Sequence, residues 1–237
     1  MNWTGIRAVL FDLDGVITPT AEIHMVAWNE MFNAFLSARG RAQPYTDADY
    51  FTYIDGKPRY DGVRDFLASR GISLPEGDPD DDPGAETVCG LGNRKNATFN
   101  RILERDGVRA YPGTLALLDD LDARGIAAAV VSSSKNARSV LAAAGLGERF
   151  DVVVDGNLAR QEQLRGKPAP DTYLRAAELV GVPKEACVVV EDAVSGVQAG
   201  RAGAFGVVLG VDRGAGADTL RSSGADVVVS DLEEARP

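Results

Sequence analysis

The sequence predicts an α/β protein whose core is a doubly wound parallel sheet of the Rossmann-like kind, with an α-helical domain inserted after the first strand. Two observations support this fold class. From Gly125 onward, short runs rich in valine and alanine alternate with helical stretches. By contrast, residues 16–109 contain no convincing strand but have helical periodicity. We therefore predict a core domain formed by 1–15 and 110–237, and a helical domain formed by 16–109.

The predicted strands are short, nearly continuous apolar runs. Such strands are typical of a parallel sheet that is covered by helices on both faces. The first run is Ile6 to Phe11, and the others cover 126–133, 150–156, 187–192, 205–211 and 225–230. The clearest helices between these later runs cover 168–180 and 194–202.

The helical insertion follows the first strand directly. Its three predicted helices cover 20–39, 59–70 and 86–106. The stretch 76–86 combines prolines, glycines and acidic residues, which predicts a solvated loop. We prefer this interpretation to a metal site because prolines interrupt the geometry that metal ligands need.

Composition limits the classes of function. The chain has 237 residues, of which 45% are hydrophobic, so it can bury a large core and is not disordered as a whole. With 25 basic and 35 acidic residues, its net charge of −10 argues against nucleic acid or an anionic membrane as a partner. An anionic small substrate would then need local basic groups or a metal. We expect a monomer.

The cysteines and the N-terminus indicate a compartment. Cys89 and Cys187 stand far apart without a CxxC spacing, so neither a disulfide framework nor a zinc site is predicted, which fits a reducing cytoplasm. The apolar run before Asp12 is too short and too soon charged for a signal peptide or a membrane span. We therefore expect a cytoplasmic protein.

Polar residues follow several predicted strands at the point where each strand ends. Asp12 and Asp14 follow the first strand, and an unpaired carboxylate taken out of water would cost several kcal/mol. Ligands of open parallel sheets lie beyond the carboxyl ends of the strands. The other polar groups expected at this edge are Ser132, Ser133, Ser134, Glu191, Asp192 and Lys167, the last of which is predicted to open a helix.

This set of groups suits phosphoryl transfer. Acids from separate strands can hold one Mg²⁺, and the metal with Lys167 would reduce the repulsion between an attacking carboxylate and a phosphoryl group. Donors near Ser132 and Ser133 would hold the phosphoryl oxygens. Asp12 can then act as nucleophile and form an aspartyl-phosphate. Asp14, kept protonated by its anionic neighbours, would donate to the leaving oxygen.

Four motifs, FDLDGV, VSSSKN, GKPAPD and VVVEDAVSGVQAG, occur in this order. Together they resemble the haloacid dehalogenase superfamily of phosphotransferases over nearly the whole chain. The resemblance implies that Asp12 is the nucleophile, and that Asp14 is the acid/base and also offers its backbone carbonyl to Mg²⁺. It implies that Glu191 and Asp192 complete the metal site, and that the inserted helices are a mobile cap over the active site.

Further motifs narrow the resemblance to the β-phosphoglucomutase-like subfamily. They are TAEIHMVAW, GKPR, NRKN, AYPG, SSSKN and GKPAPD. In that subfamily the cap arginine and lysine, here Arg59 and Lys95, grip substrate groups, and the histidine, here His24, sits near the acid/base. The phosphate- and substrate-binding residues that the resemblance implies are Thr20, His24, Arg59, Lys95, Ser132, Ser133, Ser134, Lys135, Asn136 and Lys167.

Some features depart from the subfamily or have simpler explanations. Pro19 stands where an aspartate is usual and restricts φ at a hinge position, and Ala193 stands where a serine often follows the acidic pair. On sequence alone, His24 on an amphipathic helix can serve packing or hydrogen bonding. Arg59 and Lys95 can belong to a solvated helix face. Ser134, Lys135 and Asn136 can simply form a loop and a helix cap.

Three functions remain open at this stage. The resemblance favours a Mg²⁺-dependent β-phosphoglucomutase acting on a hexose phosphate, with a sugar-phosphate phosphatase as the alternative, because both proceed through an aspartyl-phosphate. A phospho-aspartate receiver module of a signalling protein uses similar groups. However, it lacks a long helical insertion, and its motif order differs.

Overall fold

The computed structural model describes residues 1–237, and the chain divides into two compact units. The first, which we call the core unit, consists of Met1–Thr20 and Val108–Pro237. The second, which we call the helical unit, consists of Ala21–Gly107. Each unit has its own hydrophobic cluster. That the helical unit serves as a cap stays a proposal.

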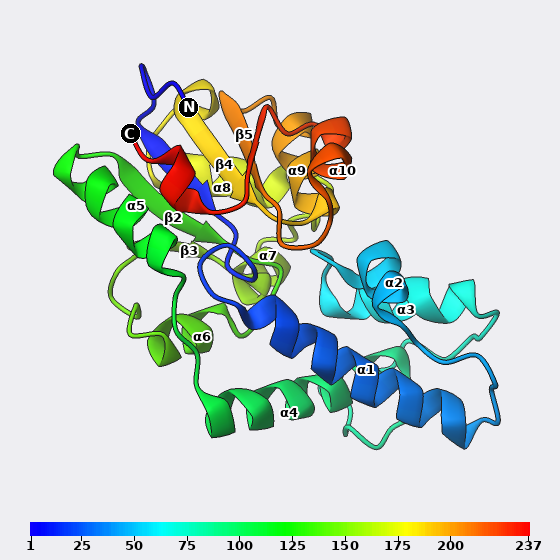
Figure 1. The fold of residues 1–237 in the computed structure, drawn as a ribbon. Helices are drawn as coiled ribbons and strands as arrows, with labels where there is room; N and C mark the ends of the chain where they lie inside the picture. The colour runs from blue at the N-terminus through cyan, green and yellow to red at the C-terminus, as the bar shows by residue number, and fades with distance from the viewer. The chain divides into compact units, whose positions relative to one another are not determined.

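The core unit contains a six-stranded, fully parallel sheet with the strand order β3-β2-β1-β4-β5-β6 (Figure 1). This confirms the predicted fold class. The strands are β1 (Ala8–Phe11), β2 (Ala127–Val131), β3 (Val152–Val154), β4 (Cys187–Glu191), β5 (Val207–Val211) and β6 (Val227–Val229). Each lies within one of the six apolar runs. The first strand is central, because Ala8 is in register with Ala127 on one side and with Cys187 on the other.

Helices cover both faces of the sheet, as right-handed crossovers between parallel strands require. The chain first builds β1, β2 and β3 outward, then crosses to β4 and builds in the other direction, which places the later helices on the opposite face (Figure 1). The α-helices of the core unit are α5 (Pro112–Ala123), α6 (Ala137–Ala143), α7 (Gly156–Gln161), α8 (Asp171–Leu179), α9 (Val194–Ala202) and α10 (Ala217–Ser223). Short 3-10 helices cover η2 (Lys184–Ala186) and η3 (Leu232–Ala235).

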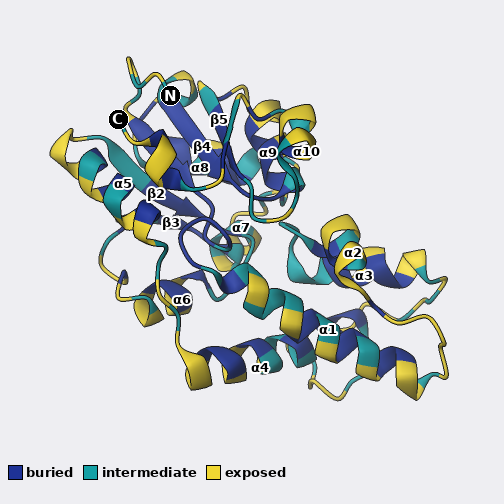
Figure 2. Cartoon of the chain, in the orientation of Figure 1, coloured by how far each residue is buried: buried dark blue, intermediate teal, exposed yellow.

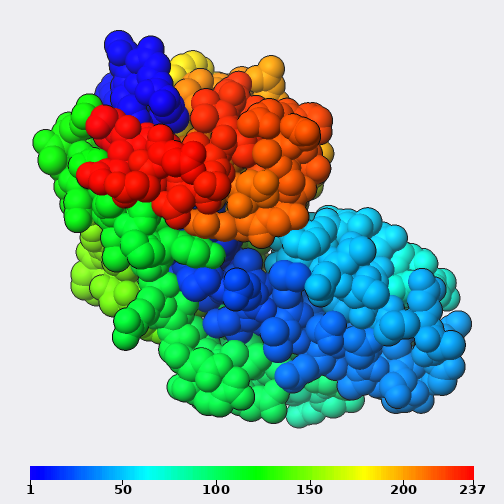
Figure 3. Space-filling view, viewed as in Figure 1, coloured from blue at the N-terminus to red at the C-terminus, as the bar shows by residue number.

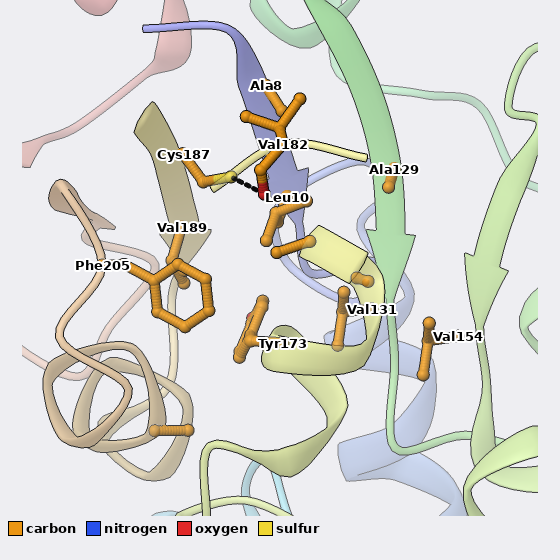
Figure 4. Packing of buried hydrophobic residues seen from close by; sticks show 13 residues of the cluster. Ala8, Leu10, Ala129, Val131, Val154, Tyr173, Val182, Cys187, Val189 and Phe205 are labelled. Atoms are coloured by element: carbon orange, nitrogen blue, oxygen red, sulfur yellow. Dashed lines mark hydrogen bonds between the residues drawn. The ribbon is translucent and has the colours of Figure 1, made fainter. Parts of the chain in front are cut away.

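One hydrophobic cluster of the core unit lies between the sheet and the helices α8 and α9. Alternate strand residues such as Leu10, Val131 and Val189 point toward Tyr173 of α8 (Figure 4). All four residues of β1 are fully buried, and Figure 2 shows much of the sheet dark, with exposed residues on the outer faces of the helices. Each buried Val or Leu side chain contributes about 1.5–3 kcal/mol. This packing fixes the strand ends that carry the polar groups.

The C-terminal segment packs on the same unit. Figure 3 shows it in red beside the green surface of α5. Arg236 Nε donates to Asp120 Oδ2 of α5 at 2.6 Å, and Trp3 Nε1 donates to the carbonyl of Ala235 at 2.9 Å. These contacts join both ends of the chain to the core unit.

The helical unit contains three long helices, as predicted, and one short helical segment that was not predicted. The long helices are α1 (Thr20–Ala38), α3 (Arg59–Ser69) and α4 (Val88–Asp106), and the short segment comprises α2 (Asp47–Asp49) and a π-helical turn η1 (Tyr50–Ile54). Thr46 begins this segment with a capping box to Asp49. The unit packs around aromatic residues such as Phe32 and Phe66, whose ring centroids are 4.2 Å apart.

The acidic stretch 76–86 has no regular secondary structure, and most of its residues are exposed. It is nevertheless attached to α4. Asn93 Nδ2 donates to the carbonyls of Pro79 at 3.0 Å and Asp81 at 2.9 Å, and Arg94 Nε donates to the carbonyl of Pro83 at 2.7 Å. The predicted loop is therefore held by α4 at several points.

No helix within residues 1–237 combines the length and the apolar character that crossing a membrane requires.

Candidate active site

The end of β1 leads into a tight loop that carries both predicted catalytic acids. The Asp12 N–H donates to the carbonyl of Val190 at 2.9 Å, which keeps Asp12 in the plane of the sheet. Gly15 then takes a φ of +84°, a region that favours glycine. Beyond the loop, the Thr20 hydroxyl donates to Asp14 Oδ1 and contacts the Thr18 hydroxyl at 2.8 Å. The loop thus presents two carboxyl groups at the carboxyl edge of the sheet.

Lys167 lies in a turn before α8 and connects three strands. Its Nζ is 2.5 Å from Asp12 Oδ1 and 2.6 Å from Glu191 Oε1, and it donates to the carbonyl of Val131 at 3.1 Å. Burial alone lowers the pKa of this ammonium. Attraction to the two carboxylates outweighs that effect, so the pKa stands above its ordinary value and Lys167 stays charged.

The prediction that Lys167 opens a helix was wrong. The helix begins at Asp171, four positions later. Pro168 and Pro170 account for the difference, because proline has no N–H to donate and disfavours the α conformation in the residue before it. Lys167 therefore reaches the sheet edge from a turn.

Glu191 is the last residue of β4 and is fully buried. Besides Lys167, it accepts a hydrogen bond from the Tyr173 hydroxyl at 2.8 Å, and its other oxygen accepts from the Ala193 N–H at 3.2 Å. Burial and the neighbouring carboxylates, chiefly Glu191, raise the pKa of Tyr173 well above its ordinary value, so this hydroxyl remains a donor. These contacts fix Glu191 so that it holds Lys167 in place.

Three buried carboxylates form a group that can hold a cation. The ligand atoms of Asp12, Glu191 and Asp192 all lie within 4.8 Å of one another. Lys167 supplies one positive charge against these three acids. Burial raises the pKa of Asp12 well above its usual range; Lys167 opposes this shift, while Glu191 and Asp14 add to it. A divalent cation would complete the charge balance and favour the ionised carboxylates.

The backbone around these acids makes room for them. A Cβ on Gly15 would collide with the Asp192 carboxylate, and a Cβ on Gly196 would collide with the Glu191 carboxylate. Oxygen ligands in this number and closeness suit a hard cation such as Mg²⁺. The donor set therefore fits the predicted metal, while its identity stays a proposal.

The loop after β2 carries the predicted hydroxyl groups. Ser132 is buried, and its Oγ accepts from the Ser134 N–H at 3.0 Å, which leaves the hydroxyl hydrogen available to donate elsewhere. Ser134 Oγ accepts from the Asn136 N–H at 3.1 Å. A Cβ on Gly156 would meet the Ser133 carbonyl, so the start of α7 packs directly against this loop. Local hydrogen bonds thus form the loop, as its simpler explanation predicts, but Asn136, which stands at the N-cap of α6, makes no side-chain cap hydrogen bond.

Asp155 was not predicted as part of the site region. It is buried at the end of β3, and its carboxylate caps α7 by accepting from the Asn157 and Leu158 N–H groups at 3.0 and 2.9 Å. The Asn157 side chain then donates to the carbonyl of Lys135 at 2.9 Å. An acid directly after a strand and before Gly-Asn is a cap signal that the sequence contains.

The predicted residues of the helical unit fall into two groups, and the first is His24 with Lys95. Lys95 Nζ contacts His24 Nδ1, and it lies 5.0 Å from the ring centroids of both Trp28 and Phe99. The His24 ring stacks on Phe99 with centroids 4.2 Å apart. Lys95 is only 3% exposed, so it does not belong to a solvated helix face. The aromatic faces stabilise this buried ammonium through cation–π contacts.

Arg59 forms the second group. Its Nη2 donates to Asn96 Oδ1 at 2.7 Å and its Nη1 to Asn93 Oδ1 at 3.4 Å. Both acceptors are neutral amides, so the positive charge is not neutralised by them. Burial lowers the pKa of Arg59, although a guanidinium keeps its proton at any ordinary pH. An arginine in this setting is suited to binding an anion.

The parallel sheet with buried acids at its carboxyl edge is the arrangement expected of a phosphotransferase of the Rossmann-like fold, and comparison with known proteins gives the family. A family model described as haloacid dehalogenase-like hydrolase matches residues 6–203. The chain belongs to this family and is an enzyme of the haloacid dehalogenase superfamily.

Individual proteins of this family show which members the chain is similar to. A protein from Mycobacterium bovis named beta-phosphoglucomutase is 52% identical over 238 residues, which cover 97% of this chain and 91% of that protein. Hexitol phosphatase A from Escherichia coli is 30% identical over 237 residues, covering 96% and 92% respectively. A crystal structure of a Clostridium difficile beta-phosphoglucomutase superimposes with a TM-score of 0.78 at 26% identity, covering 97% of this chain and 92% of that one.

Proposed function

We propose that this enzyme is a Mg²⁺-dependent β-phosphoglucomutase that converts β-glucose 1-phosphate to glucose 6-phosphate through an aspartyl-phosphate. The observation that carries the chemistry is Lys167 Nζ placed 2.5 Å from Asp12 Oδ1, inside a group of three buried carboxylates. The similarity to the Mycobacterium bovis protein supports the choice of substrate.

The roles of the core residues follow from their positions. Phosphorylated Asp12 transfers its phosphoryl group to the C6 hydroxyl of β-glucose 1-phosphate, and the proton of that hydroxyl passes to Asp14. The resulting bisphosphate then returns its other phosphoryl group to Asp12, and Asp14 gives the proton back to the leaving oxygen. Lys167 reduces the repulsion between Asp12 and the phosphoryl oxygens.

A metal would be held by Asp12 and Asp192, with Glu191 as a third carboxylate or as the support of Lys167. When bound, Mg²⁺ supplies charge neutralisation for the transferring phosphoryl group. Ser132 and the neighbouring N–H groups would donate to the phosphoryl oxygens. Thr20 orients Asp14 through its hydroxyl.

The helical unit would supply the second anion site. A mutase must bind the phosphate that is not being transferred, and the Arg59 guanidinium can offer two parallel donors to it. Asn96 and Asn93 hold the guanidinium without neutralising it. Lys95 and His24 would bind hydroxyl or phosphate oxygens of the same substrate, and the loop residues Ser134, Lys135 and Asn136 would contact it from the core unit.

The test is a single time course with β-glucose 1-phosphate, Mg²⁺ and a trace of glucose 1,6-bisphosphate. We expect glucose 6-phosphate to form at least about tenfold faster than inorganic phosphate, because the phosphoenzyme is transferred to sugar and not to water. Excess chelator is the control and should stop both products. Formation of phosphate as the main product, without any effect of the bisphosphate primer, would reject the mutase.

A second candidate is a sugar-phosphate phosphatase. The similarity to hexitol phosphatase A favours it, because that relative covers the chain as completely as the mutase does. The two candidates share Asp12 and Asp14 and differ in whether water or sugar accepts the phosphoryl group. A screen of hexose and hexitol phosphates that finds rapid phosphate release from one of them would select the phosphatase.

Substituting Arg59 tests the second anion site. We expect Arg59→Lys to lower the mutase kcat/KM by roughly tenfold or more, about 1.4 kcal/mol, because a lysine cannot make two parallel hydrogen bonds to one phosphate. Hydrolysis of acetyl phosphate, which carries no second phosphate, should be unchanged and serves as the control. Equal losses for both substrates would show that Arg59 does not bind the distal phosphate.

A further inference from the structure

Arg213 lies in the turn after β5, outside every motif that the sequence analysis used. Each nitrogen of its guanidinium donates to a different acceptor. Nε donates to the carbonyl of Gly15 at 3.0 Å, Nη1 to the carbonyl of Ser230 at 3.0 Å, and Nη2 is 3.5 Å from Asp231 Oδ2. The guanidinium also stacks on the Tyr111 ring, with its carbon 4.0 Å from the centroid. This side chain therefore joins the catalytic loop to two other segments of the core unit, one at Ser230 and Asp231 and one at Tyr111.

The loop that Arg213 contacts is held through three successive carbonyls. Gly15 accepts from Arg213, Val16 accepts from the Thr114 hydroxyl at 2.7 Å, and Ile17 accepts from the Tyr111 N–H at 2.9 Å. The second and third of these donors lie where the chain returns from the helical unit. Arg213 is the donor that comes from the opposite half of the sheet, and its stacking on Tyr111 braces that returning segment.

Through Gly15, Arg213 is connected to one of the three carboxylates that can hold a cation, Asp192. The Gly15 backbone packs so closely against Asp192 that a Cβ would collide with the carboxylate. Asp12 lies three residues before Gly15 in the same loop. The Gly15 peptide therefore borders the space that the Asp192 carboxylate occupies beside Asp12, and these two carboxylates come from neighbouring strands β1 and β4.

We propose that Arg213 is a positioning residue that fixes the Gly15 peptide and thereby sets the spacing of Asp12 and Asp192 for the metal. This inference rests on the metal-dependent function proposed above. An arginine is required because its planar group makes three hydrogen bonds in fixed directions while one face stacks on Tyr111. A lysine at this position keeps the charge but cannot make this set of contacts.

The experiment compares Arg213→Lys and Arg213→Met with the wild-type protein by titration with Mn²⁺, followed by electron paramagnetic resonance of the free ion. We expect the Mn²⁺ dissociation constant to rise about tenfold in both variants, about 1.4 kcal/mol. The rate of phosphoenzyme formation from acetyl phosphate should fall by a similar factor, while KM for acetyl phosphate changes about twofold or less. Arg221→Met, which removes an exposed arginine paired with Asp218, is the matched control and should change neither quantity.

Several results would overturn the inference. One is unchanged Mn²⁺ affinity and unchanged phosphoenzyme formation in both Arg213 variants. Another is a lower unfolding temperature with unchanged Mn²⁺ affinity per folded molecule, since this would show a role in stability alone. If the wild-type protein itself fails to bind Mn²⁺, the metal-dependent function is rejected together with the inference, so the two failures are distinguishable.

Discussion

Asp12→Asn is expected to abolish phosphoryl transfer, by roughly 10⁴-fold or more, while the protein remains folded. The reason is that an amide is not a nucleophile toward phosphorus, whereas its size matches that of the carboxyl it replaces. The Asp12 backbone contact with Val190 does not depend on the side chain and is kept. Intact-protein mass spectrometry after incubation with acetyl phosphate should detect the phosphoenzyme in the wild-type protein and not in the variant.

Asp14→Asn provides the matched comparison in the same loop. Acetyl phosphate has a leaving group that needs little protonation, so this variant should still form phosphoenzyme while its turnover of a sugar phosphate is largely lost. Comparing the activity of each variant toward acetyl phosphate and toward a sugar phosphate therefore distinguishes the role of the nucleophile from that of the acid/base. Normal turnover by Asp12→Asn, after peptide mapping has excluded deamidation back to aspartate, would show that another residue is the nucleophile.

The parts of the core unit that the sequence predicts well are those with a strong local signal. Short valine-rich runs such as Val188 to Val190 are typical of buried parallel strands, and acids that follow such strands are then expected at the carboxyl edge. The expectation that acids from separate strands can share one metal followed from their place at this edge, whereas the pairing of β1 with β4, which brings Asp12 close to Glu191 and Asp192, was not predicted. That expectation needed no knowledge of side-chain contacts.

The contacts that were missed join residues far apart in the sequence. Tyr173 looks like an ordinary apolar residue of an amphipathic helix, and its bond to Glu191 depends on how α8 packs on the sheet. Arg213 follows a strand within a glycine-rich turn, and nothing local indicates that it reaches Gly15. The short helices at 47–54 were missed because a capping box is a weak signal without a long apolar period after it.

In the helical unit too, the helices could be predicted from local sequence patterns, whereas the contacts between distant residues could not. The periods of α1, α3 and α4 are long enough to be recognised. The burial of Lys95 between Trp28 and Phe99 could not be predicted, because a lysine on a charged helix is ordinarily solvated. Only the resemblance to a family distinguished it from its neighbours.

Lys167→Met should have the largest effect on stability among the site residues. The substitution roughly keeps the volume of the side chain but removes the ammonium that lies within 2.6 Å of both Asp12 and Glu191. Breaking a buried ion pair by removing one partner costs about 3–5 kcal/mol, because the remaining carboxylates are left in a poorly solvated site. For a chain of this size the unfolding temperature should fall by roughly 10 °C, measured by calorimetry without divalent metal.

Lys57→Met is the control for the same chemical change at the surface. Lys57 pairs with Asp65 at 2.7 Å, but both side chains are partly exposed, so its loss should cost about 0–1 kcal/mol. Mg²⁺ should then raise the unfolding temperature of Lys167→Met by more than that of the wild-type protein, because the added cation replaces a missing positive charge among three carboxylates. Two results would contradict this expectation: Lys167→Met is no less stable than Lys57→Met, or Mg²⁺ stabilises Lys167→Met no more than it stabilises the wild-type protein. Either result would show that the three carboxylates do not depend on Lys167 for their charge balance, and that the electrostatic account of the site is wrong.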